Sequence, residues 1–330
     1  MKLKKTMALL LVALLTIGLV TGCKSSNSSK ETSGDDGDSA SAEAVTIWYY
    51  WETEAHQVTL DKVIQDFNTS QEGYKVTAKY VPFADFKKQL SIGASADELP
   101  DITILDSPDH ASYAQMGIFE DLTGKFDVNS YYEGTVNSCT IDEKLYGVPF
   151  GVNCLALYYN EDMLNNAGQN VPATWDELME TAKALTTEGV SGLAFSSVQN
   201  EEGTFNFTPW LWSTGATSYE MNSEGGIKAL TYVKELVESG VMSKECTNWT
   251  QGDVMNQFIS GNVAMMVNGP WQIPGMQEEV PDLNWKVTLI PKDKEYASVL
   301  GGENYAVIKG GNTEGALEFL KYATEEEQVK

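Results

Sequence analysis

Two successive series of alternating strand and helix patterns constrain the fold of this chain more than any other feature. In the first series, residues 45–49 and 101–105 are short apolar runs, and residues 74–80 alternate apolar side chains with Lys and Thr. Between the strands at residues 45–49 and 74–80, apolar residues from Leu60 to Phe67 recur at helical spacing. This β-α-β rhythm predicts an α/β fold, in which helices cover a sheet.

The second series begins with a strand pattern at residues 154–159 and continues through several helices. Thr174 and Glu177 form a capping-box pattern that opens one helix. Further elements are expected as a long amphipathic helix through Ile227, Leu230, Val233 and Val237, a helix capped by Thr250 with Val254, Phe258 and Ile259, a buried strand at residues 263–267 and a final helix at residues 315–330. About 290 residues of patterned sequence are too many for one hydrophobic core and predict two lobes.

The first 20 residues have the pattern of an export signal. Lys2, Lys4 and Lys5 precede an uncharged apolar run at residues 7–20, which is shorter than a membrane-spanning helix. Small residues before Cys23 resemble a bacterial lipobox, so we expect residues 1–22 to be a signal peptide and Cys23 to carry lipid. A signal peptide cut elsewhere, or an uncleaved anchor, would fit the same residues.

Residues 23–43 join this anchor to the patterned sequence. They are nearly all small, polar or charged, which predicts a disordered tether that reaches on the order of 25 Å. The predicted location is therefore the extracellular face of the cell membrane, with lipid anchoring rather than a span. At the other end, the final helix lacks a capping glycine, and we expect the chain to be truncated there.

Charge and composition narrow the classes of ligand. The chain carries 47 acidic and 22 basic residues, and every base is Lys. This charge argues against nucleic acid as a partner, and the lack of Arg weakly disfavours an anionic ligand. With two His and no ligand motif, no metal or cofactor is expected. Apart from Cys23, the cysteines are Cys139, Cys154 and Cys246, and one disulfide or three free thiols would both fit.

Short segments in a fixed order resemble the extracellular solute-binding proteins of ATP-driven sugar importers, the family that includes maltose-binding proteins. These segments are residues 45–51 (Val-Thr-Ile-Trp-Tyr-Tyr-Trp), 99–102 (Leu-Pro-Asp-Ile), 145–150 (Leu-Tyr-Gly-Val-Pro-Phe), 156–160 (Ala-Leu-Tyr-Tyr-Asn), 172–178 (Pro-Ala-Thr-Trp-Asp-Glu-Leu), 258–266 (Phe-Ile-Ser-Gly-Asn-Val-Ala-Met-Met), 269–271 (Gly-Pro-Trp) and 301–302 (Gly-Gly). The resemblance implies a type II periplasmic-binding-protein-like fold, with two lobes, a hinge and a ligand cleft between them. It implies crossings near Val152 and Leu300, which give lobe 1 as residues 44–151 plus 301–330 and lobe 2 as residues 152–300.

Aromatic and polar residues that end strands are the candidate ligand-binding residues in lobe 1. Trp51 and Glu52 follow the first strand and Asp106 follows the third, where ligands of open α/β sheets bind. An indole can stack on the apolar face of a sugar ring, and carboxylates can accept hydrogen bonds from its hydroxyls. The alternative roles are core packing for Trp51 and helix capping for Asp106.

Further candidates lie at the crossings and in lobe 2. Asn153 and the pair Gly302 and Glu303 lie at the two expected crossings, and Gly301 and Asn304 flank that pair. Trp210 is favoured over Trp212, because residues two positions apart cannot share one helical face. The resemblance matches Trp271 to a position where the family places a stacking ring. We assign Trp175 to the packing of its helix.

The resulting hypothesis is a monomeric substrate-binding lipoprotein that captures a sugar or oligosaccharide and delivers it to the permease subunits of an ABC transporter. A polyamine or a peptide is the alternative ligand. A secreted carbohydrate-active enzyme would use two carboxylates about 5–10 Å apart. This alternative is disfavoured because the sequence has no nucleophile elbow, metal motif or phosphate loop. A purely adhesive or sensory surface lipoprotein is a third reading.

Overall fold

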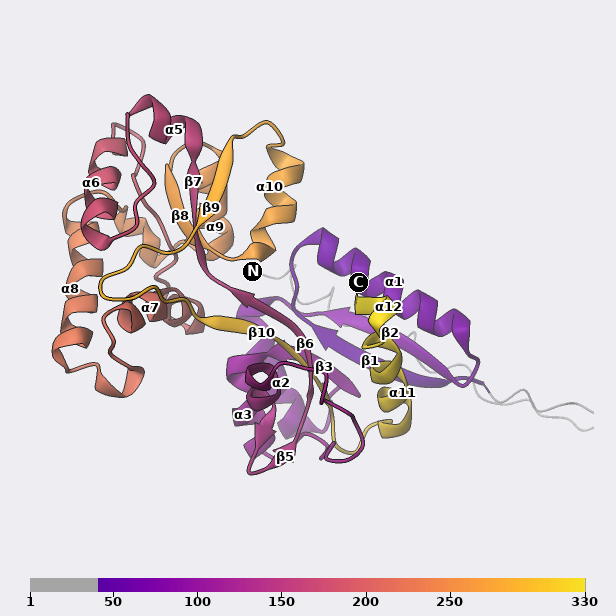
Figure 1. Ribbon diagram of the computed structural model, residues 1–330. Helices are drawn as coiled ribbons and strands as arrows, with labels where there is room; N and C mark the ends of the chain where they lie inside the picture. The colour runs from indigo at the N-terminus through magenta and orange to yellow at the C-terminus, as the bar shows by residue number, and fades with distance from the viewer. Residues whose placement is uncertain (1–40, 330) are drawn as a thin grey trace, which may run out of the picture. The chain divides into compact units, whose positions relative to one another are not determined.

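The computed structural model describes residues 41–329, which form an α/β fold with two main sheets (Figure 1). The expected signal peptide, the lipidated Cys23 and the expected tether up to residue 40 lie outside the described residues. The first strand begins at Glu43, within the stretch expected to be tether. The first sheet has one hydrophobic core and the second sheet has two, so the two halves do not share a core.

The first sheet has five strands, in the order β2-β1-β3-β10-β6. Strand β1 pairs in parallel with β2 and β3, whereas β10 pairs antiparallel with β3 and β6. The strands are β1 Glu43–Tyr49, β2 Tyr74–Tyr80, β3 Ile102–Asp106, β6 Val148–Cys154 and β10 Leu300–Val307. The helices of this half, together with a small β4–β5 hairpin, are α1 Glu54–Ser70, α2 Phe83–Ala96, α3 Ser107–Gln115, α4 Glu133–Ser138, β4 Thr140–Ile141, β5 Lys144–Leu145, α11 Thr313–Ala323 and α12 Glu326–Val329.

Alternation along β1 explains the core of this half. Val45 and Ile47 are fully buried, while Thr46 between them is exposed. Helices α1 and α11 pack on each other through Phe67 and Phe319, whose ring centroids lie 5.4 Å apart edge to face. The predicted strands at residues 45–49, 74–80 and 101–105 are therefore confirmed, with small shifts of their ends.

The second sheet has three strands, in the order β8-β7-β9, and all neighbours are antiparallel. Its strands are β7 Ala156–Asn160, β8 Met265–Asn268 and β9 Trp285–Thr288. Its helices are α5 Glu161–Asn166, α6 Trp175–Leu185, α7 Glu201–Ser213, η1 Ser218–Glu220, α8 Glu224–Glu238, η2 Lys244–Thr247, α9 Gln251–Ile259, η3 Pro270–Gln272 and α10 Ile273–Glu279. The capping boxes at Thr174 and Thr250 both form, which confirms the two predicted helix starts.

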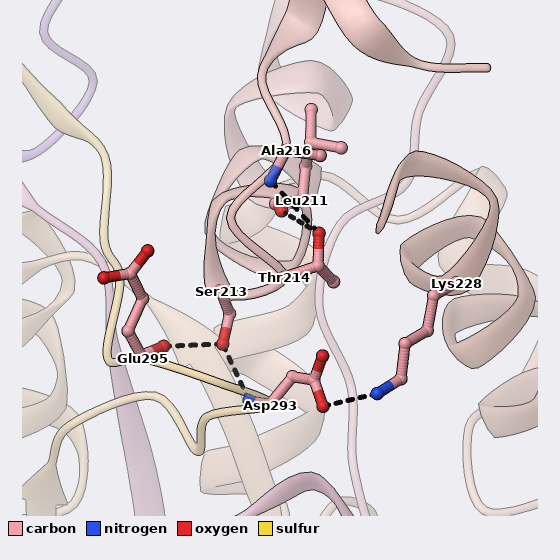
Figure 2. Close-up of polar contacts among 7 residues, drawn as sticks. All are labelled: Leu211, Ser213, Thr214, Ala216, Lys228, Asp293 and Glu295. Atoms are coloured by element: carbon pink, nitrogen blue, oxygen red, sulfur yellow. Dashed lines mark hydrogen bonds and ion pairs between the residues drawn. The ribbon is translucent and has the colours of Figure 1, made fainter. Parts of the chain in front are cut away.

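Helix α7 is fixed at its carboxyl end by the network in Figure 2. The Ser213 hydroxyl donates to the carbonyl oxygen of Glu295 (2.7 Å) and accepts from the amide of Asp293 (2.8 Å). The Asp293 carboxylate in turn pairs with Lys228 of α8 at 2.6 Å. These contacts tie α7 to α8 and to the segment that leads into β10, so the other end of α7 is held in place for the site.

The two sheets are connected through β6 and β10, which pair with each other. Cys154 ends β6, Leu155 follows, and β7 begins at the next residue; the Ser298 hydroxyl bonds to both backbone groups of Leu155. Gly302 of β10 lies opposite Val152 of β6 in the ladder. The crossings expected near Val152 and Leu300 thus fall within two paired strands.

Three sequence expectations need correction. The strand expected at residues 154–159 is divided, because β6 ends before Leu155. The final helix is interrupted after Ala323, where the Thr324 hydroxyl bonds to the carbonyl oxygen of Leu320. Helix α8 buries Ala229, Tyr232 and Leu236, whereas Ile227 and Leu230 are 57% and 49% exposed. Tyr232 sets this rotation, since it stacks on Trp175 at 4.2 Å and donates to its carbonyl oxygen.

Within residues 41–329, none of the helices has the length and apolar character to cross a membrane. The three cysteines of this part of the chain are free thiols, which resolves the open question of a disulfide. Cys139 and Cys246 are buried and Cys154 is exposed. Trp175 is 4% exposed and packs in the second core, as expected.

We expect Gly302→Ala to destabilise the fold strongly. Gly302 has φ +134°, and a Cβ there would meet the carbonyl oxygen of Gly151 at 2.1 Å. Strain of this kind costs about 2 kcal/mol or more, or roughly 5 °C in Tm, measurable by calorimetry. Gly73→Ala, where the nearest atom would be 3.6 Å away, is the control. Equal Tm values for the two variants would contradict the constraint at Gly302.

Candidate ligand-binding cavity

One cavity of about 590 Å³ collects residues from both halves of the chain. From the first half come the ends of β1 and β3 and the paired strands β6 and β10; from the second come the starts of α7 and α9 and the turn η3. Strand ends and helix starts therefore meet at one place. Open α/β proteins bind ligands at such an edge.

Aromatic rings line the cavity from both sides. Trp51 and Phe150 belong to the first half, and their ring centroids lie 5.0 Å apart with planes 34° apart. Phe205 and Trp271 belong to the second half, with centroids 6.4 Å apart. Trp51 is 8% exposed and Phe150 is 37% exposed, so the first pair combines a fixed ring with an accessible one.

The local sequence around Trp271 explains how its ring is placed. Strand β8 ends at Asn268, and Gly269 with Pro270 turns the chain into η3. A Cβ at Gly269 would lie 2.0 Å from the Trp271 ring, so the indole rests directly against the glycine backbone. The Asn268 side chain bonds to the amide of Gly269 and donates to the carbonyl oxygen of Gln251, which joins this turn to α9.

Glu202 holds the start of α7 to the start of α9. Its carboxylate accepts from the backbone amide of Gln251, and it is only 8% exposed. Burial raises the pKa of Glu202, and the hydrogen bond from the Gln251 amide acts in the opposite direction. A negative charge at a helix N-terminus is favourable, so this carboxylate stabilises the lining of the cavity.

Glu303 is a carboxylate of the cavity that has hydrogen-bond donors beside it. Its Oε1 accepts from the Tyr50 hydroxyl at 3.3 Å, and the Trp51 indole also donates to it. Burial raises the pKa of Glu303, although these two donors favour its charged form. The carboxylate is thereby held beside the Trp51 ring.

Asp106 and Glu201 also line the cavity, and nearby carboxylates add to the effect of burial on the pKa of each. Burial raises the pKa of Asp106 well above its ordinary value, and the charges of Glu201 and Glu303 add to the effect. Burial also raises the pKa of Glu201, while Lys87 lowers it. Asp106 lies directly opposite Glu303 in the β3–β10 ladder, where like charges repel.

The cavity brings together six of the eight residues that the sequence indicated. Those lining it are Trp51, Glu52, Asp106, Asn153, Trp271 and Glu303. Asn153 contributes a buried amide oxygen without a hydrogen-bond partner among the described residues. The neighbouring Gly301 also lines the cavity, whereas Asn304 is buried and bonds to Ser138.

The structure places Trp210 and Gly302 outside the lining of this cavity. Trp210 is fully buried, lies 5.3 Å from Phe195 in a stacked arrangement and does not line the cavity. Trp212, which was set aside, is 39% exposed and does not line it either. Gly302 is buried in the strand pairing, where its backbone meets β6 instead of the cavity.

Sequence reasoning missed several lining residues, of which Phe150, Glu201, Phe205 and Gln251 are the most important. Phe150 was part of a quoted motif but was not assigned to the site. Gln251 directly follows the predicted cap Thr250, so the start of that helix offered a signal. Glu201 and Phe205 lie on a helix that was not predicted from its pattern.

We expect Asp106→Asn to stabilise the protein at neutral pH. The pKa of Asp106 is raised in the folded state, so the folded state binds the proton more tightly and stability falls as pH rises above 3.8. The variant should therefore melt a few degrees higher than the parent at pH 7.5, with the difference vanishing near pH 3.8. Thermal unfolding across this range, with the surface variant Asp282→Asn as control, measures the effect. A lower Tm for Asp106→Asn at pH 7.5 would refute it.

Comparison with known proteins agrees with this fold. Residues 62–330 match the family of bacterial extracellular solute-binding proteins. A relative named as a binding protein in Brucella abortus is 26% identical over 272 residues, which are 79% of this chain and 66% of the relative. The chain thus spans slightly less than two thirds of that relative's length.

Solved structures match over a larger share of the chain. A solute-binding protein of an ABC transporter from Thermotoga lettingae, bound to α-D-tagatose, is 25% identical with a TM-score of 0.80 and covers 87% of this chain and 78% of its own. The GacH receptor of Streptomyces glaucescens, solved without ligand and with acarbose, is 27% identical with a TM-score of 0.78 over the same shares. On its sequence and its fold, this chain belongs to the family of bacterial extracellular solute-binding proteins.

Proposed function

We propose that the protein captures a sugar or short oligosaccharide in this cavity. The observation that carries the proposal is that both halves supply aromatic rings, Trp51 and Phe150 from one and Phe205 and Trp271 from the other, to one space lined by carboxylates and amides. A pyranose has an apolar face and a rim of hydroxyls, so rings and acceptors together match it. The saccharide ligands of the matched structures support the same class.

Capture in this proposal is reversible and involves no reaction. A ligand that touches both halves favours the conformation in which both contact it at once, and a hinge at the β6–β10 crossing would allow that change. The membrane permease subunits of an ABC transporter would bind the ligand-bound form. The binding protein would act as a monomer. Hydrolysis of a reporter glycoside by the purified protein would contradict the binding role.

Anchoring to the extracellular face of the membrane completes the proposal. The sequence that ends in Cys23 supports lipid attachment, and the charged and polar tether after it would keep the binding unit close to its permease.

Cys23→Ser should release the protein from the membrane. Because the thiol of Cys23 would carry the lipid, its loss should move the protein from the detergent phase to the aqueous phase of a detergent partition. Labelling with a palmitate analogue should disappear in the same variant and persist in Cys154→Ser. An unlabelled parent protein would rule out the anchor.

The sugar proposal is tested by a thermal-shift screen with mono- and oligosaccharides, followed by calorimetric titration. A ligand at 100 times its Kd stabilises the folded state by about 2.7 kcal/mol. We expect Trp271→Ala to weaken binding at least tenfold, because it removes a stacking surface of the cavity. Trp212→Ala, in an exposed ring outside the cavity, should leave affinity unchanged. Unchanged affinity in Trp271→Ala would remove that ring from the site.

A further inference from the structure

The charged lining of the cavity is entirely acidic in the part of the chain that the structure describes. Its carboxylates are Glu52, Asp106, Glu201, Glu202 and Glu303, and no lysine lines it. The one basic ring is His56, whose pKa is lowered by burial and which is therefore neutral at neutral pH.

Three of the five carboxylates are stabilised by a hydrogen-bond donor or by water. Glu202 accepts from the start of α9, Glu303 accepts from Tyr50, and Glu52 is exposed to water. The Asp106 and Glu201 side chains make no hydrogen bond or ion pair with any other described residue. Lys87 is near both but pairs with Asp109 at 2.8 Å, and it does not line the cavity.

The positions of these two carboxylates are costly without a partner. Asp106 is in register with Glu303 across an antiparallel ladder, so two acids point from adjacent strands toward one space. Glu201 brings a third acid from the opposite half, at the first residue of α7. The buried amide oxygen of Asn153, also without a donor, adds a neutral acceptor to the same lining.

We infer that the saccharide bound here carries a free amine, and that Asp106 and Glu201 bind its ammonium group from opposite sides of the cavity. This inference rests on the proposed function and narrows its substrate class to amino sugars that are not acetylated. Asp106 and Glu201 are then specificity-determining residues, while the aromatic rings contact the sugar faces.

An ammonium group fits the lining better than the alternatives. A hydroxyl donates one hydrogen bond and leaves the carboxylate charges in place, whereas an ammonium donates three and compensates charge. An N-acetyl group is neutral and would leave the acids uncompensated. A uronic acid would add a like charge to a space without a cation, which is unfavourable in a desolvated site.

The test titrates the full chain calorimetrically near pH 6.5 with β-1,4-linked glucosamine di- and trisaccharides. Cellobiose and cellotriose, which carry a hydroxyl in place of each amine, and the N-acetylated oligomers are the comparison series. Spermidine is included as an ammonium source without a sugar ring. Each titration is repeated with Asp106→Asn and Glu201→Gln, and with Asp282→Asn as a surface variant of equal charge change.

We expect the glucosamine oligomers to bind at least tenfold more tightly than both comparison series. That advantage should be lost in Asp106→Asn and Glu201→Gln and kept in Asp282→Asn. Equal or weaker binding of the amine series, including binding of neutral saccharides alone, would overturn the amine inference and leave the sugar proposal standing. Binding of spermidine without any saccharide would overturn the sugar proposal itself. No binding by any of these compounds would overturn the amine inference, and the broader saccharide screen would then decide the sugar proposal separately.

Discussion

The antiparallel pairing of β6 with β10 joins the two halves of the chain. Both strands belong to the first sheet, yet each connects directly to the second half of the chain. Their ladder therefore fixes where the two halves are joined. The same strands supply Gly151, Asn153, Gly301 and Glu303 to the cavity, so the connection between the halves and the lining of the cavity share one piece of backbone. Close contact at Gly302 explains why that backbone cannot carry a side chain there.

The acidic side chains that line the cavity lower the stability of the folded protein. Asp106 is opposite Glu303 in the ladder, which brings like charges near each other, and burial of Asp106 and Glu201 removes water that would otherwise screen them. A protein selected only for stability would replace at least one of these acids. The Glu202 carboxylate, by contrast, accepts a hydrogen bond from the start of α9, so the unpartnered acids Asp106 and Glu201 mark the place where we propose that a ligand binds.

Much of the fold follows from local patterns, because strand alternation and capping boxes act within a few residues. Trp51 and Asp106 could be placed in the site for the same reason: the ends of neighbouring strands meet at one edge. Trp210 was favoured over Trp212, but neither ring lines the cavity, because the position of each depends on how α7 is rotated against Phe195 in the second core. The exposed Ile227 shows the same limit, because the stacking of Tyr232 on Trp175, distant in sequence, decides which face of α8 is buried. Phe150 and Phe205 come to line the same cavity only through tertiary structure.

The environments of the cysteines give the molecule a selective chemical handle. Burial raises the pKa of Cys139 to about 12 and also raises the pKa of Cys246, so neither thiol is readily ionised or reached by a reagent. Cys154 is the exposed thiol of the described residues, and it lies opposite Leu300 at the end of the strand that connects the two halves. In a protein whose Cys23 carries lipid, a maleimide dye would therefore attach at the crossing itself, and its emission would be sensitive to a rearrangement of the backbone there.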